Sequence, residues 1–300
     1  MHYNRNRTYI LIYKGGKTLD TLTEIQRNIL IASIIADGEI TKIYKNSRRK
    51  NHSYREHYGR DQEDYRKWKV SFFNGLLYLT PKSNTVHSKS LPLFTRLYPN
   101  FYKPNGIKTL PPESIMKLCQ NPYFLAILYM DDGSLCISTR INHRKKLIYL
   151  TPHIYLYLQC YQKEELIYLQ NFIKNIFHLS FHLSSRKDGN GYILKTTSVR
   201  ETFQFLQTIN PVTLSCHSMF YKTSWNHRLK METTEWKIKY PTYTIISTDS
   251  ERYRAYTNEE IDTLIKFKKE GLTINQIAEK LNRSYWSIVY KWKEINKEGL

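Results

Sequence analysis

Cysteines and long apolar segments are scarce in this sequence, and each scarcity excludes a class of protein. Its cysteines, Cys119, Cys136, Cys160 and Cys216, are scattered and form no C-x-x-C pair. This pattern argues against a zinc site or a disulfide framework and favours a reduced, intracellular setting. No apolar run approaches the roughly 20 residues that span a bilayer. The apolar stretch near the N-terminus is too short for a signal peptide. We therefore expect a protein that is neither secreted nor membrane-bound.

Acidic residues are also scarce, because 26 Asp and Glu stand against 46 Lys and Arg, for a net charge of +20. So large a positive charge predicts a polyanionic partner such as nucleic acid. The charge is uneven: residues 251–300 hold ten basic and eight acidic residues, a net of +2, which leaves +18 for the first 250 residues. A structural nucleic-acid-binding protein would be equally basic, but it would not need buried acids.

Two short segments repeat one apolar pattern that ends in Asp-Gly. "LIASIIADG" at 30–38 aligns without a gap with "LAILYMDDG" at 125–133, so that Asp37 matches Asp132. A helix that is apolar on every face is buried or packs on two sides. A single such segment would read as a helix that ends in solvent, with Gly133 as its cap. Two copies, 95 positions apart, instead indicate a duplicated domain.

The seam between the duplicated halves is predicted to be the contact between these two helices. Ala32 and Ala36 on the first helix and Ala126 on the second would permit close packing. Asp37 and Asp132 would then meet at two negative helix ends, where they repel unless cations lie between them. Mg²⁺ binds such oxygen ligands, and metals held there can activate water for phosphoryl transfer.

The second half of the chain reads as helix, two strands, helix, two strands, helix, and the first half agrees with this order. We therefore predict an α+β fold with duplicated halves at 1–115 and 116–230 and a linker at 231–256. Residues 257–297 read as three short helices, the outline of a small all-α helix-turn-helix domain. Capping boxes that mark helix starts are predicted for Thr23 with Gln26, Thr257 with Glu260 and Thr273 with Gln276. On its third helix, Arg283, Lys291 and Lys293 are expected to face DNA. A three-helix protein-interaction module is the alternative.

The two motifs, the order of elements and the basic charge resemble the LAGLIDADG homing endonucleases, in particular their single-chain members with two motifs. The resemblance implies two pseudo-symmetric αββαββα halves that form a saddle of antiparallel sheets. It also implies that Asp37 and Asp132 are catalytic acids and metal ligands. "KTLP", which begins at Lys108, and "MFYK", which ends at Lys222, match segments whose lysines stabilise phosphate charge or relay protons. The C-terminal segment resembles Myb-like or homeodomain-like modules.

The resemblance implies further roles around these four residues. Asp131 would lie near the metal or bind it weakly, and Gln159 would lie near the site and contact DNA or water. Basic residues of the hairpin loops would contact DNA: Lys42, Lys45, Arg48, Arg49, Lys50, Arg140, Arg144, Lys145 and Lys146. The expected cofactor is Mg²⁺, with Mn²⁺ able to substitute. The expected partner is double-stranded DNA with a long asymmetric target, bound by a monomer.

The sequence thus predicts a site-specific double-strand DNA endonuclease encoded within an intron or other mobile element. It would act in a bacterial or phage cytoplasm or in an organelle matrix. Two alternatives stay open. One is a non-catalytic transcription regulator that joins a decayed core of this type to a helix-turn-helix, although such decay usually removes the acids. The other is an RNA maturase that binds its host intron RNA, because basic sheets bind either polymer.

Overall fold

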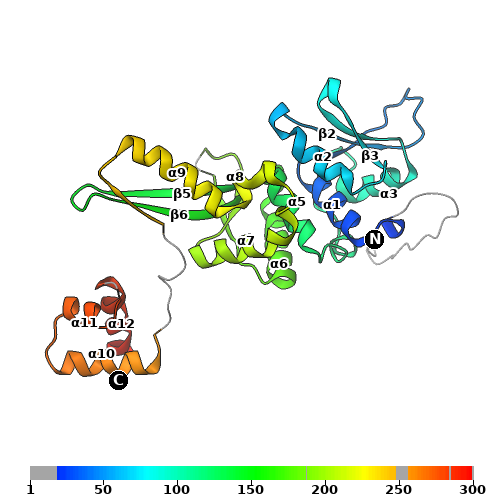
Figure 1. Ribbon diagram of the computed structural model, residues 1–300. Helices are drawn as coiled ribbons and strands as arrows, with labels where there is room; N and C mark the ends of the chain where they lie inside the picture. Colours follow the sequence, from blue (N-terminus) through cyan, green and yellow to red (C-terminus); the bar gives the residue numbers. More distant parts are fainter. Residues whose placement is uncertain (1–18, 187, 248–255, 284, 299–300) are drawn as a thin grey trace. The chain divides into compact units, whose positions relative to one another are not determined.

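The computed structural model describes residues 19–186, 188–247, 256–283 and 285–298, and the chain divides into two compact units, Met1–Ser250 and Glu251–Leu300. The larger unit combines helices and sheets, whereas the smaller is built of helices (Figure 1). Among the helices that the described residues form, none is both long and apolar enough to cross a membrane.

The larger unit repeats one order of elements in two halves. The first half contains α1 (Glu24–Ile35), β1 (Glu39–Thr41), β2 (Ser53–His57), α2 (Glu63–Ser71), β3 (Leu77–Thr80), β4 (Thr85–Ser88) and α3 (Pro92–Phe101). The second contains α5 (Pro122–Asp132), β5 (Gly133–Asn142), β6 (Leu147–Leu156), α6 (Lys163–Phe177), β7 (His182–Ser185), β8 (Tyr192–Lys195) and α7 (Val199–Thr213). The strand orders, β1-β2-β4-β3 and β5-β6-β8-β7, correspond position by position. The predicted pair of αββαββα halves with antiparallel sheets is confirmed.

Short elements complete the larger unit. They are the 3-10 helices η1 (Leu19–Thr21), η2 (Arg60–Gln62), η3 (Pro81–Ser83) and η4 (His217–Met219), and the single-turn helices α4 (Glu113–Met116) and α8 (Phe220–Thr223). Helix α4 leads from the first half into α5, and α8 follows α7 and carries the end of the "MFYK" segment.

The two motif helices, α1 and α5, pack against each other at the centre of the larger unit (Figure 1). Thr23 and Gln26 form the predicted capping box at the start of α1. Helix α5 begins with Pro122 after the N-cap Asn121, whose side chain accepts from the backbone of Tyr123. Most of each helix is buried, including Ala32 and Ala126, which have no exposed surface. The apolar surround of both helices is therefore explained by burial on all sides.

The position that ends each motif has no room for a side chain and therefore requires glycine. Gly133 has an extended backbone with φ of −105°, so the left-handed cap expected of a solvated helix end is not formed. A Cβ atom at Gly133 would lie 2.1 Å from Tyr129 Cδ2 and 2.5 Å from the Tyr129 carbonyl oxygen. At Gly38 it would lie 2.3 Å from Tyr54 Oη and 2.7 Å from the Ser33 carbonyl oxygen. The strand that leaves each motif thus lies against its own helix.

This close approach predicts a large effect for a small substitution. Gly133→Ala is expected to lower the free energy of unfolding by about 2–3 kcal/mol, because the backbone atoms that the new methyl group meets cannot move aside cheaply. Gly59→Ala is the matched control, since no atom lies within 4 Å of a Cβ placed there. Urea denaturation followed by tryptophan fluorescence measures both. Equal stability of the two variants would contradict this account of Gly133.

The segment predicted as a linker at 231–256 instead holds most of a helix and a strand. Helix α9 covers Trp225–Lys239, and β9 (Thr244–Ser247) pairs in parallel with β6, with Leu147 opposite Thr244. No residue of α9 is fully buried, and its less exposed side includes the ion pair between Arg228 and Glu232. The helix therefore lacks the apolar period on which sequence recognition depends.

Strand β9 holds the tip of the β5–β6 hairpin in place. The Thr244 amide donates to the Lys146 carbonyl oxygen at 2.9 Å. Next to it, His143 Nδ1 and Tyr243 Oη lie 3.0 Å apart. The tip, expected to contact DNA, is thus tied by backbone and side-chain hydrogen bonds to the chain segment that follows α9.

The smaller unit consists of α10 (Asn258–Lys269), α11 (Ile274–Lys280) and α12 (Tyr285–Glu298). The predicted capping boxes at the first two helices are present, formed by Thr257 with Glu260 and by Thr273 with Gln276. A small apolar core joins the helices and contains Leu264, Ile277, Ala278, Ile288 and Ile295. The three helices over 257–297 thus occur as expected, with their own core.

Candidate active site

Asp37 and Asp132 lie at the C-terminal ends of the two packed motif helices. Asp37 follows Ala36, the C-cap of α1, and Asp132 is the last residue of α5. Burial, the carboxylate of Asp37 and then that of Asp131 raise the pKa of Asp132 to about 7. The two motif acids are therefore near enough to repel each other, which is the electrostatic situation that a shared cation would relieve.

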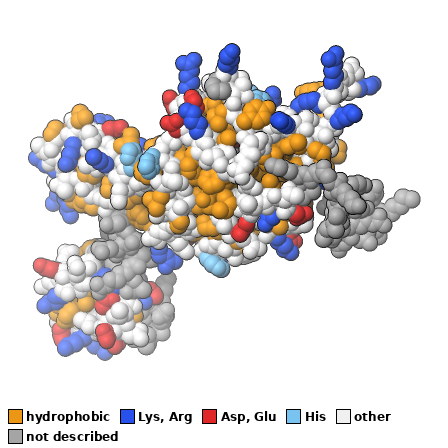
Figure 2. Space-filling view, turned by 45° about the vertical axis from the view of Figure 1, so that its right-hand side comes forward, with side chains coloured by type: hydrophobic (Ala, Val, Ile, Leu, Met, Phe, Trp, Pro, Cys, Tyr) orange, Lys and Arg blue, Asp and Glu red, His pale blue; other side chains and the backbone are white. Residues whose placement is uncertain are grey.

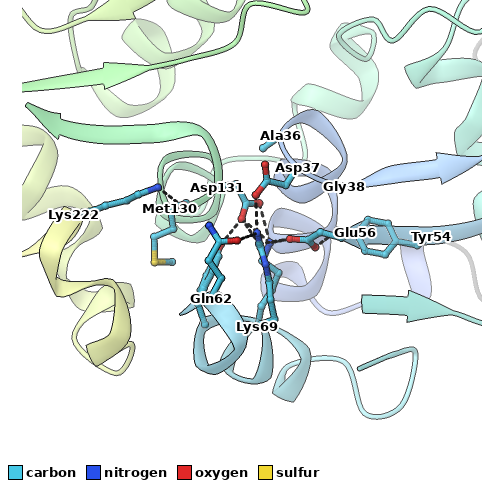
Figure 3. A network of polar contacts seen from close by, with 12 residues as sticks. Ala36, Asp37, Gly38, Tyr54, Glu56, Gln62, Lys69, Met130, Asp131 and Lys222 are labelled. Atoms are coloured by element: carbon cyan, nitrogen blue, oxygen red, sulfur yellow. Dashed lines mark hydrogen bonds and ion pairs between the residues drawn. The ribbon is translucent and has the colours of Figure 1, made fainter. Parts of the chain in front are cut away.

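Lys108 and Lys222 each reach the end of one motif helix. Lys108 Nζ donates to the carbonyl oxygens of Ala36 at 2.6 Å and Gly38 at 2.9 Å. Lys222 Nζ donates to the carbonyl oxygen of Met130 at 2.9 Å, as Figure 3 shows. These carbonyls lie at the negative helix ends, so the two ammonium groups satisfy them. Burial lowers the pKa of both lysines.

A buried network of charges adjoins Asp37, and the sequence analysis did not predict it. Arg66 on α2 has no exposed side-chain surface, and its Nη2 donates to Asp37 Oδ2 at 2.7 Å. Its Nη1 donates to Asp131 Oδ1 at 2.6 Å and also pairs with Glu56. Lys69 Nζ donates to Glu56 Oε1 at 2.8 Å and to Asp131 Oδ2 at 2.8 Å (Figure 3). The network joins α2 of the first half to α5 of the second.

Asp131 belongs to this network. It accepts from Arg66 and Lys69 and also from Tyr65 Oη at 2.8 Å. Burial acts to raise its pKa, but the charges of Lys69 and Arg66 outweigh burial and hold the pKa below the usual range. Because both of its oxygens already have donors, Asp131 is poorly suited to the weak metal binding considered for it.

Three carboxylates in this region form a group whose geometry alone would suit a cation. Ligand atoms of Asp37, Glu56 and Asp131 lie within 4.8 Å of one another. However, Arg66 contacts all three carboxylates, and Lys69 contacts two of them. The positive charges that a metal would supply are thus already present. The group is a salt-bridge network, and the repulsion between Asp37 and Asp132 is the better guide to a metal.

A signal for this network was present in the sequence. Asp131 extends a buried apolar helix, so it required a buried cation from elsewhere in the chain. In "EDYRKWKV", Arg66 and Lys69 are three apart and therefore share one helix face with Tyr65. Their partner is 62 to 65 positions away along the chain, and no local pattern specifies a pairing at that range.

The turn that follows β6 carries Gln159 and Cys160. With its amide oriented to satisfy its neighbours, Gln159 donates to the Tyr157 carbonyl oxygen at 3.2 Å and accepts from Arg186. These partners place Gln159 toward the β7–β8 hairpin. Cys160 is exposed, and its thiol interacts electrostatically with Lys108 and Asp132.

The basic residues expected to contact DNA differ in whether their side chains bond within their own loop. Lys42, Lys45, Arg48 and Lys50, like Arg140, Arg144, Lys145 and Lys146, are exposed. Figure 2 shows lysine and arginine side chains standing out from the face in view. Arg49 instead braces its own loop, because Nη1 donates to Thr41 Oγ1 and Ser53 Oγ at 3.0 Å each.

In the smaller unit, Arg283 occupies an internal position. Its Nη2 donates to Glu260 Oε2 at 2.7 Å, and its guanidinium lies 4.1 Å from the centre of the Tyr256 ring. Its side chain is only 7% exposed, so the expected contact with DNA does not agree with this placement. Lys291 pairs with Glu294 at 2.7 Å, whereas Lys293 is exposed.

Comparisons with known proteins agree with the repeated motifs. The model of the LAGLIDADG DNA endonuclease family matches residues 27–203, more than half of the chain. A comparison with curated proteins gives no match.

Among solved structures, the homing endonuclease I-WcaI bound to its DNA recognition sequence is 22% identical, with 64% of this chain and 83% of that chain covered and a TM-score of 0.49. I-SmaMI bound to uncleaved DNA in the presence of calcium ions is 12% identical, with 61% and 84% covered and a TM-score of 0.42. The N-terminal LAGLIDADG domain of DUF199/WhiA is 14% identical, with 64% and 87% covered and a TM-score of 0.34. On the family match and its two motifs, this chain belongs to the LAGLIDADG DNA endonuclease family as a single-chain member.

Proposed function

We propose that this protein is a Mg²⁺-dependent, site-specific double-strand DNA endonuclease encoded within an intron or other mobile element. The observation that carries the proposal is the pair of motif acids at adjacent helix ends, where a half-buried lysine bonds to each end. A net charge of +18 in the first 250 residues suits a polyanionic substrate. The target would be a long asymmetric duplex, since the two halves are unequal in sequence.

The residues present fit a divalent metal. Mg²⁺ prefers carboxylate and water oxygens. Among the described residues, the Asp132 carboxylate has no recorded hydrogen-bond donor, and its pKa is raised by burial and by Asp37. The negative charge of Asp132 is therefore destabilised by burial and by Asp37, and a bound cation would stabilise it. Asp37 and Asp132 would hold the metal, with Mg²⁺ as the expected ion and Mn²⁺ as a substitute.

The protein's own residues would divide the remaining work. The bound metal would activate water and stabilise the leaving oxygen. Lys108 and Lys222 place one positive charge at the end of each motif helix, and both interact electrostatically with both acids. There each would stabilise the phosphate as its charge develops. Because burial lowers the pKa of both lysines, each would also release a proton to water more readily than a solvated lysine does.

The exposed basic residues of the two hairpin loops would bind the DNA backbone. Each phosphate contact is expected to contribute about −0.9 to the slope of the logarithm of the binding constant against the logarithm of the salt concentration. The three-helix unit would act as a helix-turn-helix that adds affinity beyond the core target, with Lys293 as its exposed basic residue on α12.

A cleavage assay tests the proposal. The genomic surroundings of the reading frame supply the target, because an intron around it defines the joined exon sequence. A supercoiled plasmid with that sequence is expected to become linear in Mg²⁺ and to stay intact in Ca²⁺ or EDTA. Tight, specific binding without cutting in Mg²⁺ or Mn²⁺ would overturn the proposal and favour the transcription regulator. The presence of Asp37, Asp132, Lys108 and Lys222 together supports the nuclease.

Truncation separates the roles of β9 and the smaller unit. Removing residues 251–300 is expected to weaken DNA binding about 10- to 100-fold while cleavage at saturating protein persists, because only a tethered module is lost. Removing residues 244–300 also deletes β9 and its hydrogen bond to Lys146, so target specificity should fall as well. Binding titrations and cleavage of mismatched targets measure the two effects. Identical behaviour of the two truncations would show that β9 does not order the hairpin.

A further inference from the structure

The buried charges around Arg66, three residues of the first half and Asp131 of the second, have no charged counterparts at the symmetry-related positions. Helices α2 and α6 begin after equivalent N-cap residues, Gln62 and Gln162. Counted from these caps, Arg66 corresponds to Leu166 and Lys69 to Leu169, and all four side chains are completely buried.

The acidic members of the network follow the same rule. Extending the β1–β2 register by one residue pairs Gly38 with Glu56, just as β5–β6 pairs Gly133 with Leu156. Glu56 therefore corresponds to Leu156. Asp131, one residue before the motif Asp, corresponds to Ala36. Glu56, Arg66, Lys69 and Asp131 thus occupy positions whose symmetry-related counterparts are three leucines and an alanine.

This correspondence bears on why the charges are there. Burying ion pairs costs desolvation, and well-packed apolar residues of similar volume are often equally stable or better. The symmetry-related positions, Ala36, Leu156, Leu166 and Leu169, are buried and demonstrate that this fold accepts an apolar set there. Stability of the fold alone therefore does not explain the charged set.

The charged set does one thing that the apolar set cannot do. It places a buried guanidinium on Asp37, with Nη2 2.7 Å from Oδ2, while Nη1 is held by Asp131 at 2.6 Å and by Glu56. Gln62 Oε1 also accepts from Nη2 at 3.2 Å. Because both terminal nitrogens also bond to other residues, Arg66 fixes one oxygen of Asp37 in turn. Among the described residues, Asp132 has no recorded ion pair of this kind.

We propose that Arg66 is a positioning residue for Asp37 alone, so that the two cleavage sites of this protein are unequal. The guanidinium sets the orientation of the Asp37 carboxylate before metal and DNA bind, and the Glu56 and Asp131 carboxylates that pair with it set the orientation of the guanidinium. Asp132 is oriented without this support. The inference rests on the proposed nuclease function.

Strand-resolved cleavage tests the inference. A target duplex labelled on both strands is cut by wild type, Arg66→Lys and Lys69→Met. The strand that Asp37→Asn slows more is the strand that depends on the Asp37 site. Arg66→Lys keeps a positive charge but lacks the planar fork whose two terminal nitrogens reach Asp131 and Asp37 separately. It is therefore expected to slow that strand about 10- to 100-fold, with the other strand changed less than about 3-fold. Lys69→Met is the matched control, since Lys69 lies in the same network without touching Asp37. It should slow both strands alike.

A second variant distinguishes the loss of Asp37 positioning from a general loss of folding. The combination Glu56→Leu, Arg66→Leu, Lys69→Leu and Asp131→Ala introduces the apolar residues found at the symmetry-related positions. It is expected to fold and bind target DNA in Ca²⁺ as wild type does, yet to show the same strand bias as Arg66→Lys. Crystal structures supply a readout besides activity: Asp37 should change its side-chain rotamer in both Arg66 variants and keep it in Lys69→Met.

The outcomes are distinguishable. If wild type does not cut its target, the proposed function fails and this inference falls with it. If wild type cuts both strands and the combined variant does so at wild-type rates, the nuclease stands and the role of Arg66 is refuted. Equal slowing of both strands by Arg66→Lys, or an unmoved Asp37 in its crystal structure, would likewise refute it.

Discussion

Replacing Asp37 or Asp132 with asparagine is expected to abolish double-strand cleavage while target binding in Ca²⁺ changes less than about 3-fold. An amide holds a divalent metal far less well than a carboxylate does, and a catalytic metal contributes several kcal/mol to the transition state. The expected loss of rate is therefore about 10³-fold or more. Single-turnover cleavage of a labelled duplex measures the loss, and a binding titration measures the affinity.

A control variant distinguishes chemistry from general damage. Glu39 lies near the motif and pairs with Arg55 at the surface, where both side chains are more than 40% exposed. Glu39→Gln should cut at close to the wild-type rate, since such pairs contribute little. Undiminished double-strand cutting by either aspartate variant would refute the assignment of the site.

Asp132→Asn, which is expected to abolish cleavage, is expected to raise the stability of the fold. Because the pKa of Asp132 is raised from 3.8 to about 7, the folded chain holds a proton that the unfolded chain has lost between these pH values. The stability of the wild type therefore falls as pH rises through this range. Asp132→Asn is expected to unfold about 2 kcal/mol less readily than wild type at pH 8 without metal, and to gain little near pH 4. Thermal unfolding at the two pH values measures this. A gain of the same size at both would show that the charge of Asp132 is not its cause.

The fold was predictable where one strong pattern specifies buried structure. The two apolar motifs, their 95-residue offset and their Asp-Gly ends predicted the duplication, the packed helices and the adjacent acids. The capping boxes at Thr23, Thr257 and Thr273 predicted helix starts correctly, because a cap is a local interaction between residues three apart. The lysines came from the family resemblance; a lone lysine has no local signal of burial.

The rest depended on contacts between distant residues. Arg66 and Lys69 are ordinary charged residues in a polar stretch until Asp131, more than 60 positions later, is placed beside them. Helix α9 was missed because its less exposed side includes Arg228 and Glu232, which pair with each other. Strand β9 was missed because four residues without alternation give no strand signal, and its pairing with β6 spans about 100 positions. Arg283 was assigned to DNA from its charge, although Glu260 and Tyr256 hold it.

The pairing of each lysine with one motif leads to the second large effect. Lys108 bonds to the end of α1 through Ala36 and Gly38, and Lys222 bonds to the end of α5 through Met130. Lys108→Met and Lys222→Met are each expected to slow one strand about 100-fold, the usual cost of removing one preorganised charge from a transition state. The other strand should change less than about 10-fold. Each variant would then convert a supercoiled target plasmid mainly into the nicked circle.

The two variants should nick opposite strands, and this reciprocity is what distinguishes two active sites from one. Primer extension on the nicked product identifies the strand. Lys117→Met is a suitable control, because Lys117 is 66% exposed and pairs only with Glu113, also at the surface, among the described residues; it should still linearise the plasmid. If both lysine variants nicked the same strand, or if each slowed both strands equally, the halves would share a single catalytic centre. The duplication would then account for the fold of this protein but not for cleavage of two strands.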